Sequence, residues 1–197
     1  MTLAAIVALV LGGPAVRGVA VAQLPADSAV TLVPRERQYS VIGTTATEIA
    51  QSIRRDNPFD VPGWRGSHQA QFRRRADLVM GTRGCEPSNL RIEVESEITL
   101  PDWTPRDPVD TTLVRQWARF ATDLRTHEEG HRAISVRIAE EAIRELRTLR
   151  TASCKNWSAA ADALMQRKLR EHRSRQEAHD AERRAGIGVK PQWPPRP

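Results

Sequence analysis

The fold is decided by the stretch from Thr112 to Arg150, which reads TLVRQWARFATDLRTHEEGHRAISVRIAEEAIRELRTLR. Apolar residues and histidines recur in it at steps of three and four, which is the period of one face of an α-helix. The pattern predicts one long helix of roughly 55 to 60 Å with a buried stripe. That stripe consists of Leu113, Trp117, Phe120, Leu124, His127, His131, Ile134, Ile138, Ala142, Leu146 and Leu149.

Two histidines on the stripe belong to the segment His127-Glu128-Glu129-Gly130-His131, which has the His-Glu-x-x-His spacing of a zinc peptidase helix. Residues four apart lie on one face of a helix, so both imidazoles can reach one tetrahedral cation. Glu128 is then the predicted general base beside a Zn²⁺ ion. Charged helices also produce this pattern by chance, but a chance copy falls as readily on the solvent face.

A third ligand is needed, because catalytic zinc sites have three protein ligands and a water. A second helical pattern follows the break at Thr151 to Lys155. If the two helices run antiparallel, His127 and His131 face about Arg175 to Asp180. We rank His179 and Asp180 together as third-ligand candidates, His172 lower and His68 lowest. Each of these residues, taken singly, is equally compatible with a solvated position on the surface.

The segments before the long helix predict a small, mainly antiparallel sheet. Apolar and charged residues alternate from Leu90 to Leu100, as in a strand with one buried face. A short strand is predicted at Gln38 to Gly43, a short amphipathic helix at Thr44 to Arg55, and a weaker strand at His68 to Arg75. The fold class is therefore α+β, with the sheet packed on the long helix and an antiparallel C-terminal helix after it.

The N-terminus and the cysteines indicate an exported protein. Residues 1–22 have the features of a signal peptide, with an apolar run from Leu3 to Leu11 and a small-x-small site at Ala20 to Ala22. No other segment is expected to cross a membrane, so we predict a secreted or periplasmic protein without stable membrane insertion after cleavage. In that compartment Cys85 and Cys154 are predicted to form a disulfide; the alternative is two buried thiols.

The remaining composition sets the expected domain limits and partners. Residues 23–37 are predicted to be a flexible lead-in, 38–186 a single domain and 187–197 a disordered proline-rich tail. The net charge of +6 could indicate nucleic-acid binding, but the arginines are interspersed with glutamates. We therefore expect solvated helix faces and no nucleic-acid partner. The oligomeric state is not predicted by the sequence.

The order of several short motifs resembles that of a family of bacterial predicted secreted zinc-dependent proteases, itself classed as a domain of unknown function. The resemblance covers about Tyr39 to Gly186. The motifs are Tyr39 to Thr44, Cys85 before the alternating strand, Leu100 to Trp103, Trp117, His127 to His131, and Cys154. This resemblance implies that the protein is a zinc-dependent peptidase that acts on peptides or proteins.

The C-terminal signature of that family, Tyr-Asp-x-x-Thr-x-His-Gly, is only partly present in this chain. Asp180 and Gly186 match it, whereas His179 stands for the Tyr, Arg183 for the Thr and Ala185 for the His. If the missing histidine is a ligand in relatives, this chain either uses His179 or Asp180 instead or lacks full coordination.

Two functions from different classes follow. The first is a zincin-like hydrolase in which Glu128 accepts a proton from a zinc-activated water, and in which an edge strand can bind an extended peptide. The second is a non-catalytic zincin-like envelope protein that binds partners through its charged C-terminal helix; the altered signature favours it. A basic helix for anionic surfaces is a further alternative, weakened by the interspersed acids.

Overall fold

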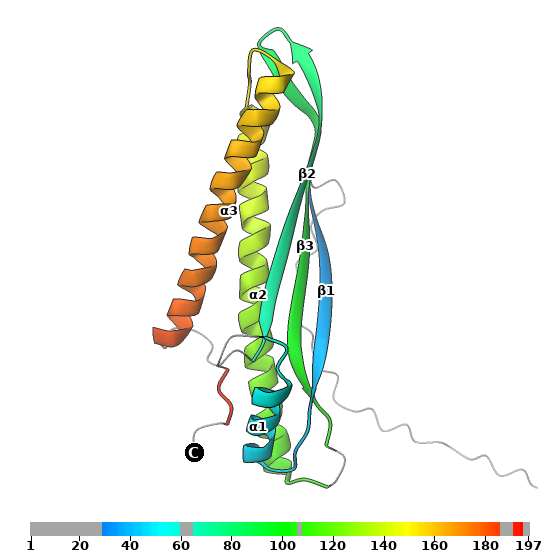
Figure 1. Cartoon of the computed structure of the whole chain (residues 1–197), viewed down its shortest axis with the longest axis vertical. Coiled ribbons are helices and arrows are strands. Elements are labelled where there is room, and N and C mark those ends of the chain that lie inside the picture. Colours follow the sequence, from blue (N-terminus) through cyan, green and yellow to red (C-terminus); the bar gives the residue numbers. More distant parts are fainter. Residues whose placement is uncertain (1–28, 60–64, 106–107, 186–190, 195–197) are drawn as a thin grey trace, which may run out of the picture.

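The computed structural model describes residues 29–59, 65–105, 108–185 and 191–194 (Figure 1). Within these ranges the chain is α+β, in the order β1 (Val30–Val41), α1 (Ala46–Asp56), β2 (Ser67–Gly81), β3 (Gly84–Trp103), α2 (Thr111–Thr148) and α3 (Cys154–Ala185). The predicted signal peptide lies outside the described residues. No helix in the described part is long and apolar enough to span a bilayer.

Helix α2 is the central element, as its periodic stripe predicts. It begins after Asp110, whose side chain accepts a hydrogen bond from the Thr112 N–H and so caps the first turn. Its buried face includes the predicted apolar positions from Leu113 to Leu146. The helix lies between the sheet on one side and α3 on the other (Figure 1), so both neighbours pack against it.

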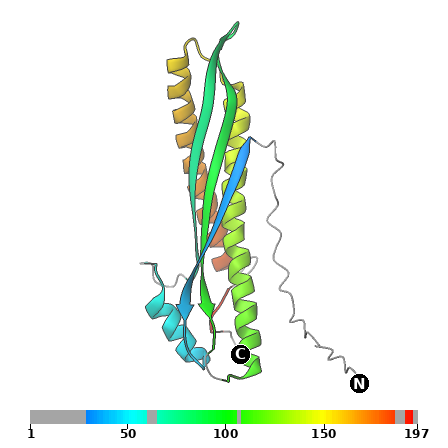
Figure 2. The ribbon, with the colours of Figure 1, turned by 90° about the vertical axis from the view of Figure 1, so that its right-hand side faces the viewer.

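The sheet is mixed, with the strand order β1-β3-β2, so the expectation of a mainly antiparallel sheet is wrong. β2 and β3 form an antiparallel hairpin, in which the short turn after Gly81 reverses the chain. β1 pairs with β3 in parallel along its whole length. The parallel pairing is possible because α1 and the loop after it connect the end of β1 to the start of the β2–β3 hairpin. The three strands run along α2 (Figure 2).

The N-terminal part of the domain begins earlier than predicted. We expected a flexible lead-in up to residue 37, but β1 starts at Val30, which is 3% exposed. The 20-residue β3 strand offers backbone partners to all of β1, from Val30 opposite Ile92 to Val41 opposite Trp103. Pro34 and the charged residues around it hid this strand in the sequence, although an edge strand tolerates both.

Helix α1 confirms the predicted short helix. Thr45 and Glu48 form a capping box, in which the Thr45 side chain accepts from the Glu48 N–H at 3.2 Å. Glu48 in turn accepts from the Thr45 N–H at 3.2 Å. Ile49 and Ile53, which lie on one face, are almost fully buried.

Two apolar clusters stabilise opposite ends of α2. The α1-end cluster consists of Tyr39, Val41, Ile49, Ala50, Ile53, Ile98, Leu100, Trp103, Leu113, Trp117, Phe120, Leu124 and Trp193. The disulfide-end cluster consists of Val30, Cys85, Leu90, Ile92, Val94, Ala139, Ala142, Ile143, Leu146, Trp157, Ala161 and Leu164. Between Leu124 and Ala139, the buried face of α2 carries polar residues, among them both motif histidines. The two clusters therefore enclose a polar layer.

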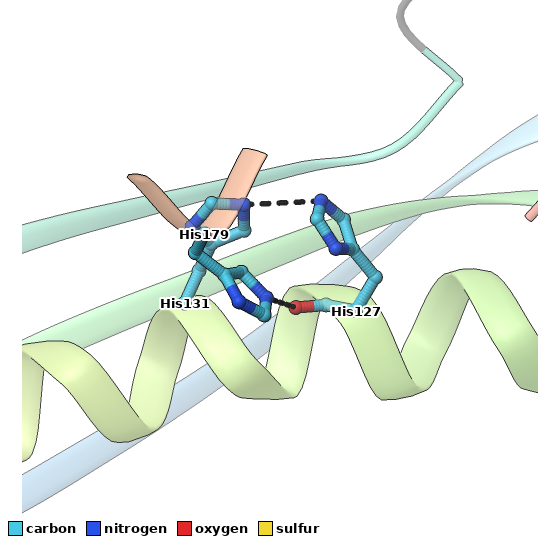
Figure 3. Close-up of side chains that lie close together, drawn as sticks. All are labelled: His127, His131 and His179. Atoms are coloured by element: carbon cyan, nitrogen blue, oxygen red, sulfur yellow. Dashed lines mark hydrogen bonds between the residues drawn. The ribbon is translucent and has the colours of Figure 1, made fainter. Parts of the chain in front are cut away.

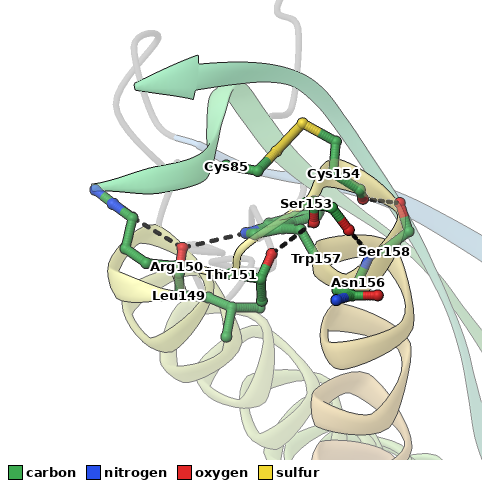
Figure 4. The surroundings of a disulfide bond; sticks show 9 residues. All are labelled: Cys85, Leu149, Arg150, Thr151, Ser153, Cys154, Asn156, Trp157 and Ser158. Atoms are coloured by element: carbon green, nitrogen blue, oxygen red, sulfur yellow. Dashed lines mark hydrogen bonds between the residues drawn. A yellow bond between two sulfur atoms is a disulfide. The ribbon is translucent and has the colours of Figure 1, made fainter. Parts of the chain in front are cut away.

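The predicted disulfide between Cys85 and Cys154 is present (Figure 4). It joins the start of β3 to the first residue of α3. The same junction is held by the backbone, because Cys85 donates to the Thr151 carbonyl at 2.7 Å and accepts from the Thr151 N–H at 3.3 Å. Gly84 has a φ of +103°, and a Cβ there would lie 2.4 Å from the Thr151 oxygen, so only glycine fits this close approach.

The C-terminal segment departs from the predicted disorder of residues 187–197. Residues 191–194 are described, and Trp193 is only 2% exposed. Its ring packs edge-on against Trp117 at 5.4 Å, and its Nε1 donates to the Ala46 carbonyl at 3.1 Å. The prolines around Trp193 predicted disorder, but burying a large indole outweighs the cost of ordering a short segment.

Candidate metal centre

The centre is built on the polar layer of α2. His127, Glu128 and His131 are 6%, 4% and 8% exposed, respectively. The i,i+4 spacing places the two imidazoles on the same face, with ring centroids 4.7 Å apart. Their Nε2 atoms approach each other to 3.2 Å. Two nitrogen donors of the predicted motif thus converge on one point inside the protein.

A carboxylate oxygen from α3 completes a triangle with these nitrogens. Asp180 Oδ1 lies 3.1 Å from His127 Nε2 and 3.4 Å from His131 Nε2. Donors bound to a tetrahedral zinc ion at 2.0 to 2.2 Å lie about 3.3 to 3.5 Å from one another. The three observed separations are close to these values, so the donor set fits the ion. In this protein Asp180 accepts hydrogen bonds from both imidazoles, which hold its pKa well below the ordinary value.

His179 also reaches the centre, and its donor atom lies within 4.8 Å of those of His127 and His131 (Figure 3). Three imidazoles could therefore hold a metal ion. However, the His179 ring stacks on His127 at 4.7 Å and only 11° from parallel. An imidazole nitrogen binds a metal near its own ring plane, so two stacked parallel rings do not direct lone pairs at one ion. His179 Nε2 instead lies 3.2 Å from the His127 carbonyl oxygen.

Gly130 makes room for this histidine. A Cβ at position 130 would lie 2.5 Å from His179 Nε2, well inside the contact distance. The fourth residue of the motif is therefore small where α3 crosses α2. This lets the His179 ring lie against the backbone of α2 and brings Asp180 toward the two Nε2 atoms.

Gln176 orients His131, and the sequence did not identify it. Its Oε1 is hydrogen-bonded to His131 Nδ1, which leaves Nε2 of that ring facing Asp180. Its Nε2 donates to the His131 carbonyl at 3.1 Å. Gln176 precedes Asp180 by one helical turn, and this spacing is the signal that could have revealed it. Burial lowers the pKa of His131, but the hydrogen bonds that its ring donates to Asp180 and Gln176 raise it, and the net pKa lies above the ordinary one.

The two lower-ranked histidines lie near the centre but outside the triangle. His172 Nε2 is 2.8 Å from Ser135 Oγ and 2.7 Å from Gln176 Nε2, so it supports Gln176. His68 Nε2 lies 3.0 Å from Ser96 Oγ, with its ring 6.2 Å from that of His131. Burial lowers the pKa of His68 to about 3, which keeps the imidazole neutral.

Glu128 faces a cleft of about 160 Å³ that opens beside the triangle. Burial raises the pKa of its carboxyl to about 7, although the positive charge of His131 opposes the rise. A Cβ on Gly66 would lie 3.0 Å from Glu128 Oε1, so the chain leading into β2 passes close to this carboxylate. The cleft is lined by Arg65, Gly66, Ser67, His68, Ala70, Leu124, His127, Glu128, His131, His172, Gln176, Asp180, Arg183 and Pro191.

Comparison with known families finds a match over residues 36–186 to the family described as "Bacterial protein of unknown function (DUF922)". Neither the curated proteins nor the solved structures contain a match. The family description names no activity. Since the match covers well over half of the chain and includes the motif and both helices of the centre, this chain belongs to the DUF922 family of bacterial proteins.

Proposed function

We propose that this protein is a zinc-dependent peptidase of zincin-like architecture. The observation that carries the proposal is the triangle of His127 Nε2, His131 Nε2 and Asp180 Oδ1, with edges of 3.1 to 3.4 Å, beside the buried carboxyl of Glu128. These residues would hold the ion. When bound, zinc supplies Lewis-acid chemistry, polarising a carbonyl and acidifying water.

The protein's own groups provide the proton transfers. Glu128 faces the cleft, so a substrate amide held there lies within reach of its carboxyl. It accepts a proton from the attacking water and donates it to the leaving nitrogen. Burial raises the pKa of this carboxyl in the metal-free protein, which makes it a better proton acceptor than an exposed glutamate. When His131 is neutral, donation of its Nδ1–H to Gln176 Oε1 leaves the lone pair on Nε2, which faces the centre.

The arrangement of α2 and α3 supports this architecture. Contacts pair Glu145 with Arg167, Ser135 with His172 and His127 with Asp180, so the numbering falls along one helix as it rises along the other. This order of contacts supports an antiparallel hairpin of the two helices. The Cys85–Cys154 disulfide supports an oxidising compartment, in keeping with a secreted or periplasmic protein.

The test compares the wild type with Glu128→Gln after both have been loaded with zinc. We expect both proteins to contain stoichiometric zinc by elemental analysis. Cleavage of a random peptide library, followed by mass spectrometry, should fall by about 10²-fold or more in the variant. Glu140→Gln, on the same helix but outside the cleft, is the matched control and should cleave like the wild type.

Two results would contradict the proposal. Absence of zinc from protein refolded with excess metal would exclude the metal centre. Stoichiometric zinc without any cleavage by the wild type would instead favour the non-catalytic alternative, a zincin-like envelope protein that acts by binding a partner.

A further inference from the structure

We propose that Arg65 and Arg183 form a carboxylate-binding subsite in the cleft, so that the preferred peptides carry an acidic group close to the scissile bond. The inference rests on the proposed peptidase function and deepens it by naming the substrate class. The carboxylate can belong to an Asp or Glu side chain or to the peptide C-terminus.

The two arginines reach the same cleft from different elements. Arg65 lies just before β2, on the same short segment as Gly66, which approaches Glu128. Arg183 lies in the last turn of α3, three residues after Asp180 and therefore about one turn along the same helix face. Both side chains line the cleft together with Glu128. A peptide held at the candidate centre would therefore pass both guanidinium groups.

The charge of Arg183 affects the pKa of Arg65 and of Glu128. Burial lowers the pKa of Arg65, and the positive charge of Arg183 lowers it further. The charge of Arg183 also lowers the pKa of Glu128, against the larger effect of burial. These effects are consistent with the shared position of the three side chains on the lining of one cleft. An anion placed between the two cations would relieve their repulsion.

Within the described part of the chain, Arg183 has no ion pair like those that Arg167 and Arg175 form on the same helix. Arg167 pairs with Glu145, and Arg175 pairs with Glu141 at 2.7 Å. Among the described residues no ion pair involves Arg183, and its buried Nε has no hydrogen-bond partner. A buried polar atom without a partner is unfavourable, and a charged one more so. The carboxylate of a ligand would satisfy it.

Arg65 is held in place by the protein at the cleft. Its Nη2 donates to the Trp193 carbonyl at 3.2 Å, and its own carbonyl accepts from the Tyr39 hydroxyl at 2.7 Å. Trp193 and Tyr39 both belong to the α1-end cluster, so the arginine is attached to the rigid core. A guanidinium fixed in this way binds a carboxylate with a smaller entropic cost.

The balance of charge in the cleft also favours an anion. Arg65 and Arg183 face the carboxylates of Glu128 and Asp180, and a divalent cation on the triangle adds two positive charges. The loaded cleft is then positive. Guanidinium groups bind carboxylates through two parallel hydrogen bonds, which makes a carboxylate the best-matched anion in a peptide.

The experiment measures binding without turnover. Zinc-loaded full-length Glu128→Gln protein is titrated with three tetrapeptides that differ only in their acidic group. One has a Glu side chain and an amidated C-terminus, one has a free C-terminus and no acidic residue, and one has neither. We expect at least one acidic peptide to bind about tenfold or more tighter than the neutral one. The stronger of the two identifies the source of the carboxylate.

Arg183→Gln, added to the same protein, should remove most of this preference, whereas Arg184→Gln should leave it unchanged. Arg184 is the matched control, since it carries the same charge one residue later and does not line the cleft. Arg183→Lys and Arg65→Gln are tested as well, with unfolding temperatures to show that each variant is folded. Lysine should keep part of the preference, because it retains the charge but not the paired geometry.

Equal binding of acidic and neutral peptides, or equal effects of Arg183→Gln and Arg184→Gln, would overturn the subsite. A carboxylate that binds the metal directly would keep its preference in Arg183→Gln. Cleavage by the wild type is measured separately with the same peptides. Cleavage without acidic preference would reject the subsite alone, whereas arginine-dependent binding without cleavage would reject the peptidase alone.

Discussion

His179 and Asp180 are adjacent on α3 but have different surroundings. Successive residues of a helix point about 100° apart, so both side chains cannot approach the same atom in the same way. Asp180 directs an oxygen at both Nε2 atoms, while His179 lies flat on His127 and against the helix at Gly130. At the scale of single residues, these directions are our reason for proposing Asp180, and not His179, as the third ligand.

This preference gives a direct prediction for zinc affinity. Asp180→Ala should weaken zinc binding by about 100-fold or more, because a ligand is lost, whereas His179→Ala should weaken it by less than about tenfold, as for a supporting contact. Competition with a chromophoric chelator measures both. Glu182→Ala, an exposed neighbour, is the control. A larger loss in His179→Ala than in Asp180→Ala would assign the third position to the histidine.

The sequence predicted the residues of the centre better than their roles. Counting from the turn between two helices placed the window at 175–180 opposite His127 and His131, and the structure brings both of its candidate ligands there. The sequence alone could not choose between His179 and Asp180, because the choice depends on the direction of each side chain where α3 crosses α2. Gln176 and Arg65 were missed because their relation to the centre arises only when α3 and β2 meet α2.

At the scale of elements, α3 is held in two different ways along its length. Its buried residues are Trp157, Ala161, Leu164 and Lys168. Beyond Lys168, the described part of the helix has no buried side chain and is held by polar contacts such as Arg175 with Glu141 and Gln176 with His131. The half of α3 that carries the candidate ligand is therefore the half with the least apolar support.

Lys168 marks the boundary between the two halves. Its side chain is only 7% exposed, and its Nζ lies 2.7 Å from Glu145, 2.9 Å from Glu171 and 3.3 Å from Glu141. Burial lowers the pKa of Lys168, but these hydrogen bonds raise it above the ordinary value. The hydrogen bond that Lys168 donates to Glu145 is in turn the largest cause of the lowered pKa of Glu145.

The lowered pKa of Glu145 predicts how stability depends on pH. As pH falls below about 4.5, the unfolded chain binds a proton before the folded one does, so stability decreases. Lys168→Met should reduce this acid sensitivity, because Glu145 then titrates nearer its ordinary pKa. Urea midpoints at pH 7 and at acidic pH measure the difference. Lys155→Met, which removes an exposed lysine, should keep the wild-type dependence.

The elements themselves were predictable to the extent that their signals are local. The long stripe of α2 and the capping residues of α1 are read within one segment, and both helices were found. The pairing of β1 is not local, since its partner β3 lies about 60 residues later. The sequence from Val30 to Val41 contains no signal for a parallel neighbour. The proline and the charged residues of this segment also make the strand difficult to recognise.

At the scale of the whole molecule, the disulfide and the α1-end cluster act at opposite ends of α2. Cys85 and Cys154 are 69 residues apart in the sequence, and their bond closes the disulfide-end cluster. A covalent link across such a loop stabilises the folded state chiefly by restricting the unfolded chain.

Removal of this bond should therefore lower the free energy of unfolding by about 4 kcal/mol. The double variant Cys85→Ser/Cys154→Ser avoids a free thiol, and urea unfolding measures the change. Wild-type protein unfolded under reducing conditions should match the variant. If thiol titration shows full reduction and the wild-type midpoint does not move, the loop is already restricted in the unfolded state and the prediction is wrong.

The burial of Trp193 has a consequence for how the molecule is made. Its ring fills the α1-end cluster beside Trp117 and Phe120, and its carbonyl holds Arg65. Partners of this core thus extend from β1 at the start of the domain to residue 193. A ribosome adds residues in order, so the nascent chain cannot complete this cluster until position 193 has been synthesised. The cleft should therefore acquire its final shape only after residue 193 has emerged from the ribosome, and after export if the protein is secreted unfolded.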